Sequence, residues 1–203
     1  DLVSLMTPLI KSFFTDIGME ITNDAIQVFG GYGYTKDQGI EQLFRDNRIT
    51  PIYEGTNSIR AIDLVYRKIL NNKIFDKYIS QITDEVKDYT NNKNLELFVQ
   101  KFQKYIELLN NFTSWLSEKN KNSKDDVSSA CNDYLKVLGY ISLAHSWLKI
   151  LKVSYEKIDK NKAFFEDKIN TAKYYFDKIL PRAQSHYLSA ITGSDTIMKS
   201  NFN

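Results

Sequence analysis

The segment Ala25-Ile-Gln-Val-Phe-Gly-Gly-Tyr-Gly-Tyr34, with Arg45-Asp-Asn-Arg-Ile-Thr-Pro-Ile-Tyr-Glu-Gly-Thr56 after it, organises the rest of the chain. Four of the eight glycines lie between positions 30 and 39, and a fifth, Gly55, directly follows a glutamate. Glycines clustered in this way let a backbone turn with positive φ and come close to a ligand. Glu54, ahead of a turn and a helix start, is placed as a base in a cleft would be. We therefore predict that this segment forms half of an active site and that the rest of the chain is helical support.

Apolar residues recur at intervals of three and four, which predicts an all-α fold, and no stretch shows the alternation of a strand. The first helix is expected to start at Thr7-Pro8, with threonine as N-cap, and to stop at Gly30-Gly31. Its expected apolar face consists of Ile10, Phe13, Ile17, Ile21, Ala25 and Val28.

Two further helices are expected in the first third of the chain. Thr35 and Gln38 resemble a capping box that opens a short helix through Leu43 and Phe44, which Thr50-Pro51 ends. The next helix is expected to begin near Thr56-Asn57. Its expected buried stripe consists of Ile59, Ile62, Val65 and Ile69.

The composition changes near Asn71-Asn72, since most arginines and glycines precede this point and the remainder is rich in lysine and asparagine. We place a boundary here, between a first segment, 1–72, and a helical bundle, 73–203. A loop is expected over Asn120–Ser123, where Ser123 would cap the next helix. The expected buried stripes of the bundle are Leu95, Phe98, Phe102, Ile106, Leu109 and Leu116, then Val127, Cys131, Tyr134, Leu138, Ile141, His145 and Leu148, then Phe165, Ile169, Ala172, Phe176 and Ile179.

The composition of the whole chain narrows the possible function classes. A formal net charge of +2 gives no case for nucleic-acid binding. The single cysteine rules out an internal disulfide and suits a reducing compartment, so we expect a cytoplasmic protein. No apolar run approaches the roughly 20 residues needed to cross a bilayer, so no membrane span is expected. Asp1 opens directly into a helical pattern without an initiator methionine, which predicts a piece of a longer protein.

Glu54 is the strongest catalytic candidate, and two roles are open for it. A glutamate before Gly-Thr is commonly a helix-start residue that the helix dipole favours. Pro51, Ile52 and Tyr53, however, would form an apolar wall that desolvates the carboxylate and raises its pKa towards that of a useful base.

A second candidate set lies at the end of the first helix, where Gln27, Gly30, Gly31 and Gly33 are placed to line a cofactor. A glycine pair after a helix is also a common C-cap. The pattern is not a dinucleotide-binding fingerprint, because no strand precedes it.

The histidines and the cysteine point to structural roles. His145 and Cys131 share an apolar helical stripe, which predicts a hydrogen-bonded core histidine and a buried, inert thiol. His186 is isolated near the end of the chain, which predicts a surface position. With two histidines and one cysteine, no metal site is expected.

Three motifs in order, Gln27-Val-Phe-Gly-Gly-Tyr-Gly-Tyr34, Arg45-Asp-Asn-Arg-Ile49 and Ile52-Tyr-Glu-Gly-Thr56, resemble the C-terminal helical domain of acyl-CoA dehydrogenases. The chain is similar in detail to the longer variety of that family, which includes the 3-methylmercaptopropionyl-CoA dehydrogenases and carries an additional C-terminal helical segment. The further matching positions are Thr7–Lys11, Glu41-Gln42, Asn57, Ala61–Leu64, Arg67-Lys68, Ile179–Pro181, Gly193 and Met198.

The resemblance implies an FAD-dependent α,β-dehydrogenation of an acyl-CoA thioester. Glu54 would be the base that removes a proton from the carbon α to the thioester, while a hydride leaves the β carbon for flavin N5. The Glu54 N–H would donate to the thioester carbonyl, with Gly55 beside the substrate. Thr56 matches a position close to the flavin. Gln27, Gly30 and Gly31 match the adenine side of FAD, which the family typically places in the neighbouring subunit.

The resemblance also implies partners, and it implies that the isolated chain is not a complete enzyme. An electron-transferring flavoprotein would accept the electrons, and the enzyme would be a homo-oligomer. Most of the family's flavin contacts lie in an N-terminal helical domain and a middle β-domain, which this chain lacks. The isolated chain is therefore expected to bind no FAD stoichiometrically and to be inactive. The alternative is a non-enzymatic helical module for assembly or partner binding, derived from such an enzyme.

Overall fold

The computed structural model describes residues 2–71 and 74–200, which form helices and turns with no strand among them. The all-α prediction is confirmed. The predicted boundary between residues 72 and 73 lies outside the described residues. The helices are α1 Leu2–Phe29, α2 Gly31–Tyr34, η1 Lys36–Gln38, α3 Ile40–Arg48, α4 Asn57–Asp63, η2 Leu64–Ile69, α5 Ile74–Lys87, α6 Glu96–Asn122, α7 Lys124–Glu156, η3 Ile158–Lys160, α8 Lys162–Tyr174, η4 Tyr175–Ile179, α9 Arg182–Ala190 and α10 Asp195–Met198.

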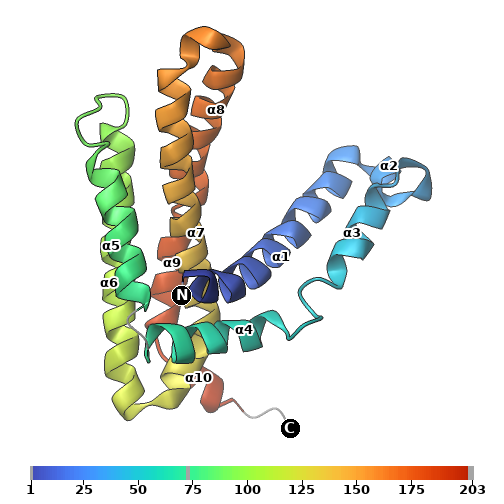
Figure 1. Ribbon diagram of the computed structural model, residues 1–203. Helices are drawn as coiled ribbons and strands as arrows, with labels where there is room; N and C mark the ends of the chain where they lie inside the picture. Colours follow the sequence, from blue (N-terminus) through green and yellow to red (C-terminus); the bar gives the residue numbers. More distant parts are fainter. Residues whose placement is uncertain (1, 72–73, 201–203) are drawn as a thin grey trace.

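The longest helix, α7, stands at the centre of the fold (Figure 1). α6 packs along it on one side, α8 and α9 pack on another, and α1 and α4 cross its lower half. One hydrophobic core joins both predicted segments, because Leu9 and Leu64 lie in the same cluster as Leu138. The bundle thus holds the first segment, and with it the candidate site, in place.

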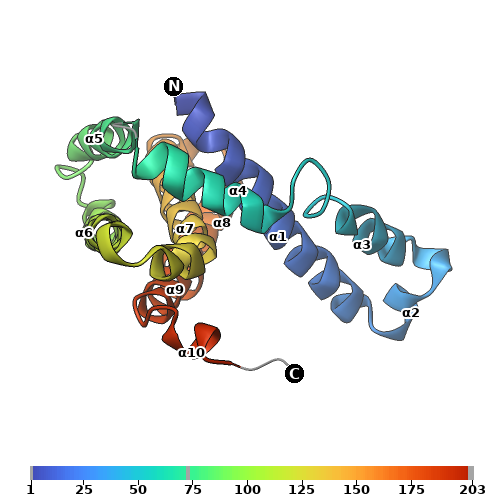
Figure 2. The same ribbon diagram turned by 90° about the horizontal axis from the view of Figure 1, so that it is seen from below.

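α1 belongs to the bundle at its start and leaves it at its end. Phe13 packs so closely on α7 that a Cβ added at Gly139 would overlap the phenylalanine ring. Beyond this crossing α1 projects away from the bundle, α2 lies at its far end, and α3 folds back beside it (Figure 2). We call α1 beyond Phe13, with α2 and α3, the arm.

Two of the predicted helix starts are wrong. α1 begins at Leu2, and Pro8 lies inside it. Only the hydrogen bond to the Ser4 carbonyl is lost, because proline has no N–H, and Thr7 Oγ1 donates back to Val3 O at 2.7 Å instead of capping. Thr35 donates likewise to Tyr32 O at 2.8 Å, so it forms no capping box, and α3 starts after Gly39.

Because α1 starts earlier than predicted, the apolar part of the helix is also longer than predicted. Among the described residues, α1 is the one helix that is long and apolar enough to cross a membrane by length and composition, with a mean hydropathy of 1.2 over its best window. The sequence pattern starting at Thr7 missed this, because it left out Leu2, Val3 and Leu5. Core helices of soluble proteins meet the same criterion. Only 28% of the window is buried inside the chain, and a single such helix near the start of the chain is weak evidence for a membrane segment.

The predicted buried stripe that runs through α4 and η2 is half correct. Val65 and Ile69 are buried, whereas Ile59 and Ile62 are exposed. The helix instead buries Ala61 and Leu64 against α7, so it is rotated relative to the prediction. Half of the predicted face of α1 is exposed, since Phe13 is buried and Ile17 and Ala25 are half-buried, whereas Ile10, Ile21 and Val28 are exposed.

The predicted stripes of the bundle helices are confirmed on α6 and α7, where every predicted residue is buried. On the third stripe, Phe165 and Ile179 are half-buried. The predicted loop at Asn120–Ser123 is wrong, because α6 continues to Asn122 and only Ser123 separates it from α7. Ser123 does cap α7, since its Oγ accepts a hydrogen bond from the Asp126 N–H at 3.3 Å.

The end of the chain is fastened to the start of α7. Asp126 Oδ1 accepts hydrogen bonds from the N–H and the Oγ of Ser194, each at 2.8 Å. Asp126 Oδ2 lies 2.9 Å from Lys119 Nζ. One nearly buried carboxylate therefore joins α6, α7 and the turn before α10.

Candidate active site

Glu54 lies in the loop of residues 49–56, which connects α3 to α4, and its backbone is unusual. Its φ is 57°, the one positive φ of a non-glycine residue in the described parts of the chain. Arg60, one turn into α4, donates from Nε to Glu54 O at 3.1 Å, and its Nη2 donates to the same oxygen. The left-handed turn at Glu54 is therefore held by a guanidinium group.

A second cation holds the next carbonyl. Lys11 Nζ on α1 donates to Gly55 O at 2.8 Å and to Asn57 Oδ1 at 2.8 Å. Asn57 Nδ2 in turn lies 2.7 Å from Asp16 Oδ1 and 2.9 Å from Thr15 Oγ1. Burial, followed by the positive charge of Arg60, lowers the pKa of Lys11 below its ordinary value. The loop is thus attached to one face of α1 by a chain of polar contacts.

The Glu54 side chain itself is exposed, and the predicted apolar wall does not cover it. Ile52 and Tyr53 are 46 and 51% exposed. The predicted desolvation of the carboxylate is therefore absent from this chain. The side chains of Ile52, Tyr53 and Glu54 are exposed, whereas Lys11 and Arg60 bind the backbone carbonyls of the loop.

The other predicted site residues lie at the far end of the arm. Gln27, Gly30 and Gly31 are exposed there, whereas Gly55 and Thr56 lie with Glu54 at the base (Figure 2). Sixteen residues of helix between Lys11 and Gln27 correspond to about 24 Å. The structure therefore brings together Glu54, Gly55 and Thr56 and separates them from the glycine cluster.

Gly33 has a packing role at the end of the arm. A Cβ added there would lie 2.7 Å from the Ile26 carbonyl oxygen and 2.8 Å from Phe29 Cβ. α2 can fold against the end of α1 only because this residue has no side chain. At Gly30 and Gly31, in contrast, an added Cβ would meet nothing within 4 Å.

Sequence reasoning assigned no role at the site to Lys11, Arg60 or Asn57. Lys11 lies on another helix, and no local pattern connects it to Gly55. Asn57 and Arg60 follow the Glu-Gly-Thr motif directly, so their proximity to the loop was the one available signal.

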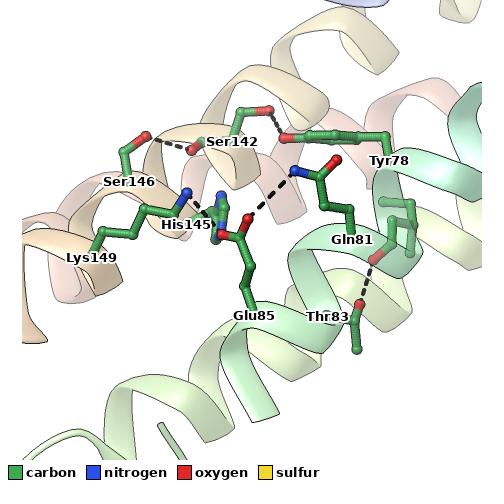
Figure 3. A network of polar contacts seen from close by, with 9 residues as sticks. Tyr78, Gln81, Thr83, Glu85, Ser142, His145, Ser146 and Lys149 are labelled. Atoms are coloured by element: carbon green, nitrogen blue, oxygen red, sulfur yellow. Dashed lines mark hydrogen bonds and ion pairs between the residues drawn. The ribbon is translucent and has the colours of Figure 1, made fainter. Parts of the chain in front are cut away.

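A separate polar cluster joins α5 to α7 (Figure 3). Glu85 Oε2 lies 2.9 Å from His145 Nε2 and 2.8 Å from Lys149 Nζ. Tyr78 and Ser142 share a hydrogen bond of 2.9 Å beside them. Burial, and then the charge of Lys149, lower the pKa of His145. The prediction of a hydrogen-bonded core histidine is confirmed.

The remaining titratable candidates are also structural. Cys131 is buried, as predicted, and burial raises the pKa of its thiol to about 12. His186 is wrongly predicted as a surface residue, because Nδ1 lies 2.8 Å from Asp133 Oδ1 and the half-buried ring stacks on Tyr140. Within residues 2–71 and 74–200, no group of three potential metal ligands occurs.

Comparison with known families matches nearly the whole chain. Residues 79–201 match the family described as "Acetyl-CoA dehydrogenase C-terminal like", and residues 3–70 match "Acyl-CoA dehydrogenase, C-terminal domain". The two matched regions, which include the Glu-Gly-Thr loop and most of the helices, thus point to one class of protein. The chain belongs to the acyl-CoA dehydrogenase family and represents its C-terminal portion, and the resemblance drawn from the motifs is confirmed.

Individual relatives share the first third of the chain. The 3-methylmercaptopropionyl-CoA dehydrogenase of Ruegeria pomeroyi is 42% identical over 69 residues, which make up 34% of this chain and 12% of that protein. The cyclohexane-1-carbonyl-CoA dehydrogenase of Geobacter metallireducens is 52% identical over 60 residues, 30% of this chain and 16% of that protein. The matched part is thus less than a fifth of the length of these relatives.

A solved structure matches almost all of the chain. The acyl-CoA dehydrogenase of Bacillus anthracis, complexed with FAD, superposes with a TM-score of 0.70 at 15% identity. The superposition covers 97% of this chain and 33% of that one. At this identity the likeness shows the fold, including the bundle that follows the Glu-Gly-Thr loop.

Proposed function

We propose that this chain forms the C-terminal part of an FAD-dependent acyl-CoA dehydrogenase in which Glu54 is the catalytic base. The observation that supports this best is the backbone of Glu54, whose φ of 57° is held by Arg60 and Lys11 on two consecutive carbonyls. Such a conformation costs about 1–3 kcal/mol and persists where the surroundings fix it, commonly at functional sites. A helix-start role alone would not require this strain.

Two groups of Glu54 would act on the substrate. Its carboxylate removes the proton from the carbon α to the thioester carbonyl, a weak acid that a base must meet at contact distance. Its backbone N–H donates to the thioester oxygen, and no described residue accepts a hydrogen bond from this N–H within the chain. FAD, when bound, accepts the hydride that leaves the β carbon. Gly55, beside Glu54, leaves room for the acyl-CoA.

The residues proposed to hold FAD are exposed and form two separate groups. Thr56 would lie near the flavin, and Gln27, Gly30 and Gly31 near the adenine side. The backbone at Gly30 and Gly31 is accessible, because nothing lies within 4 Å of an added Cβ. Since about 24 Å of helix separates the two groups, the separation supports contact with FAD molecules of different subunits in a homo-oligomer. The isolated chain would bind no FAD stoichiometrically.

The remaining assignments are also proposals. Residues 1–72 complete the dehydrogenase C-terminal domain, and residues 73–203 form the additional helical segment. An electron-transferring flavoprotein accepts the electrons, and the protein is cytoplasmic.

The test uses flavin-loaded protein prepared from the complete coding sequence that contains this chain. Replacing Glu54→Gln keeps the shape of the side chain and removes its basicity. We expect FAD and acyl-CoA still to bind, while anaerobic flavin reduction slows by at least about 10²-fold. Glu118→Gln, an exposed glutamate on α6, is the matched control and should reduce flavin at the wild-type rate. Rapid flavin bleaching by Glu54→Gln would remove Glu54 from the mechanism.

The second candidate function is a non-enzymatic assembly module, and the exposed Glu54 side chain favours it, since no catalytic cleft surrounds the carboxylate in this chain. This function predicts that the complete protein purifies without flavin absorbance.

A further inference from the structure

α7 and α8 enclose an apolar groove at the end of the bundle away from α4 (Figure 1). After α7 the chain turns through η3 and returns as α8, so the two helices run antiparallel. The groove between them has a volume of about 350 Å³, and we call it the α7/α8 groove. It is lined by Lys149, Ile150, Val153 and Ser154 of α7 and by Phe164, Phe165 and Lys168 of α8.

The floor of the groove is apolar and exposed. Ile150, Val153 and Phe164 are 38, 41 and 51% exposed. Phe165 packs edge-on against Phe164, with the ring centroids 5.1 Å apart. The hydroxyl group of Ser154 donates to Ile150 O at 2.7 Å within α7, so this donor is already used. An apolar ligand that covered the floor would gain free energy in proportion to the apolar area it removes from water.

Both lysines of the groove lie at the same end of it. Lys149 comes seven residues before the end of α7, and Lys168 comes six residues after the start of α8. At 1.5 Å per residue, each is about 10 Å from the turn that joins the two helices. Val153 and Phe164 are nearer to that turn. The α7/α8 groove therefore has a cationic end and an apolar end.

Lys168 is the lysine that can receive an anion most readily. Its Nζ lies over the ring of Phe164, 5.3 Å from the centroid, and thus at the edge of the apolar floor. Within residues 2–71 and 74–200, Lys168 takes part in no ion pair. Lys149 is instead shared with α5, because its Nζ lies 2.8 Å from Glu85 Oε2. The residues that line the groove include no carboxylate of their own.

A ligand with an anionic head and an apolar tail matches this arrangement. We propose that the α7/α8 groove binds a medium-chain carboxylate, the anion of a fatty acid. Its head would lie beside Lys168 and Lys149, and its tail would cover Phe164, Val153 and Ile150. Sites for small ligands are mostly apolar, contain a few polar groups that orient the ligand, and have volumes of about 300–1,000 Å³. The groove has this composition and lies at the lower end of this range of volumes.

The size and charge of the groove favour a small ligand over a macromolecule. A stable protein interface buries about 800 Å² on each partner, and Ile150, Val153 and Phe164 can supply only a part of that area. A lipid surface would meet mixed charge, because the segment 149–168 carries four carboxylates among six lysines. Helices that lie on membranes usually concentrate lysine and arginine on their polar face.

The test needs neither FAD nor catalysis, so its failure leaves the Glu54 experiment untouched. Decanoate is titrated into the isotope-labelled 203-residue chain and followed by nuclear magnetic resonance. The amide signals of residues 149–168 should shift and saturate, whereas those of the arm, 25–48, should not. Shorter carboxylates should bind more weakly, by up to about fourfold for each CH₂ removed. Shifts spread equally over the arm, or affinities independent of chain length, would overturn the proposal.

Two substitutions test the apolar end of the groove. Val153→Glu places a carboxylate on the exposed floor and should abolish saturable binding of decanoate. Leu97→Glu, at an exposed apolar position on α6, is the matched control and should bind decanoate as the unmodified chain does. Unchanged binding by Val153→Glu, or loss of binding in Leu97→Glu, would show that the ligand does not occupy the groove.

A third substitution tests the cationic end. Lys168→Met removes the charge and keeps a long unbranched side chain, so decanoate should bind about two- to fivefold more weakly, the range of an exposed ion pair. Decan-1-ol has no charge, and its weaker binding should not change. Lys104→Met, at an exposed position on α6, is the control and should leave both ligands unaffected. An equal loss for decanoate and decan-1-ol would contradict the proposal, and so would flotation with phosphatidylglycerol vesicles in the absence of decanoate binding.

Discussion

Lys11 Nζ lies 2.8 Å from the carbonyl oxygen of Gly55, a residue 44 positions further along the chain. The contact fastens the Glu-Gly-Thr loop to the part of α1 that is packed in the bundle. Asn57 completes the attachment, because its amide lies within hydrogen-bond distance of groups on α1. The position of the candidate base is thus set by the bundle through α1.

Asn57→Ala should destabilise the protein and loosen this loop. It removes one acceptor and two donors at a half-buried position, so the free energy of unfolding should fall by about 1–3 kcal/mol. Hydrogen exchange at residues 52–56 should become faster. Asn91→Ala, at an exposed position outside the helices, is the control and should change neither quantity. Unchanged exchange in Asn57→Ala would show that Lys11 alone suffices.

Gly139→Ala should disrupt the crossing of α1 and α7. The added methyl group would overlap the ring of Phe13, and overpacking of this kind costs typically about 1–3 kcal/mol. Gly31→Ala is the matched control, because its added methyl group meets nothing within 4 Å. Urea unfolding midpoints should separate the two variants, and equal midpoints would contradict the close crossing.

Acid should detach the end of the chain from α7. The hydrogen bond from Lys119, followed by those from Ser194, holds the pKa of Asp126 well below its ordinary value of 3.8. Because the folded pKa is the lower one, the stabilisation is complete above pH 3.8 and is lost as the pH falls towards the folded pKa. The urea concentration at the midpoint of unfolding should therefore fall when the pH is lowered below about 4. Asp126→Asn should be less stable at neutral pH and lose less on acidification, and an identical pH profile would exclude this contribution.

Cys131 should be unreactive in the folded protein. Burial raises the pKa of its thiol to about 12, so almost no thiolate exists at pH 8. A disulfide reagent should modify it only after unfolding. Ser117→Cys, exposed on α6, should react at once and serves as the positive control. Fast modification of native Cys131 would indicate that the bundle opens.

The helices of the bundle could be predicted because the spacing of apolar residues that indicates them lies within each helix. On α7 the apolar residues lie on one continuous stripe, and neighbours on several sides bury it. On α4 two apolar faces compete, and the spacing of residues does not say which one meets α7. The structure buries Ala61 and Leu64, since the rotation of α4 is tied to Asn57 and its contacts with α1.

The candidate site was predictable in its motif and not in its geometry. Glu54, Gly55 and Thr56 are adjacent in sequence, so their grouping needed no fold. The bond from Lys11 depends on where α1 crosses the bundle, and no local pattern carries that information. The exposure of Glu54 was missed for a related reason, because its neighbours Ile52 and Tyr53 are themselves exposed.

The close crossing of Phe13 and Gly139 makes α1 a lever with its pivot near the base of the arm. Lys11 lies two residues on the bundle side of the pivot, whereas Gln27 lies about 21 Å beyond it. A tilt of about 5° would therefore displace the tip by about 2 Å while the loop at Gly55 stays almost still. In such a tilt the residues proposed to contact FAD would move, whereas the residue proposed to do the chemistry would stay almost in place.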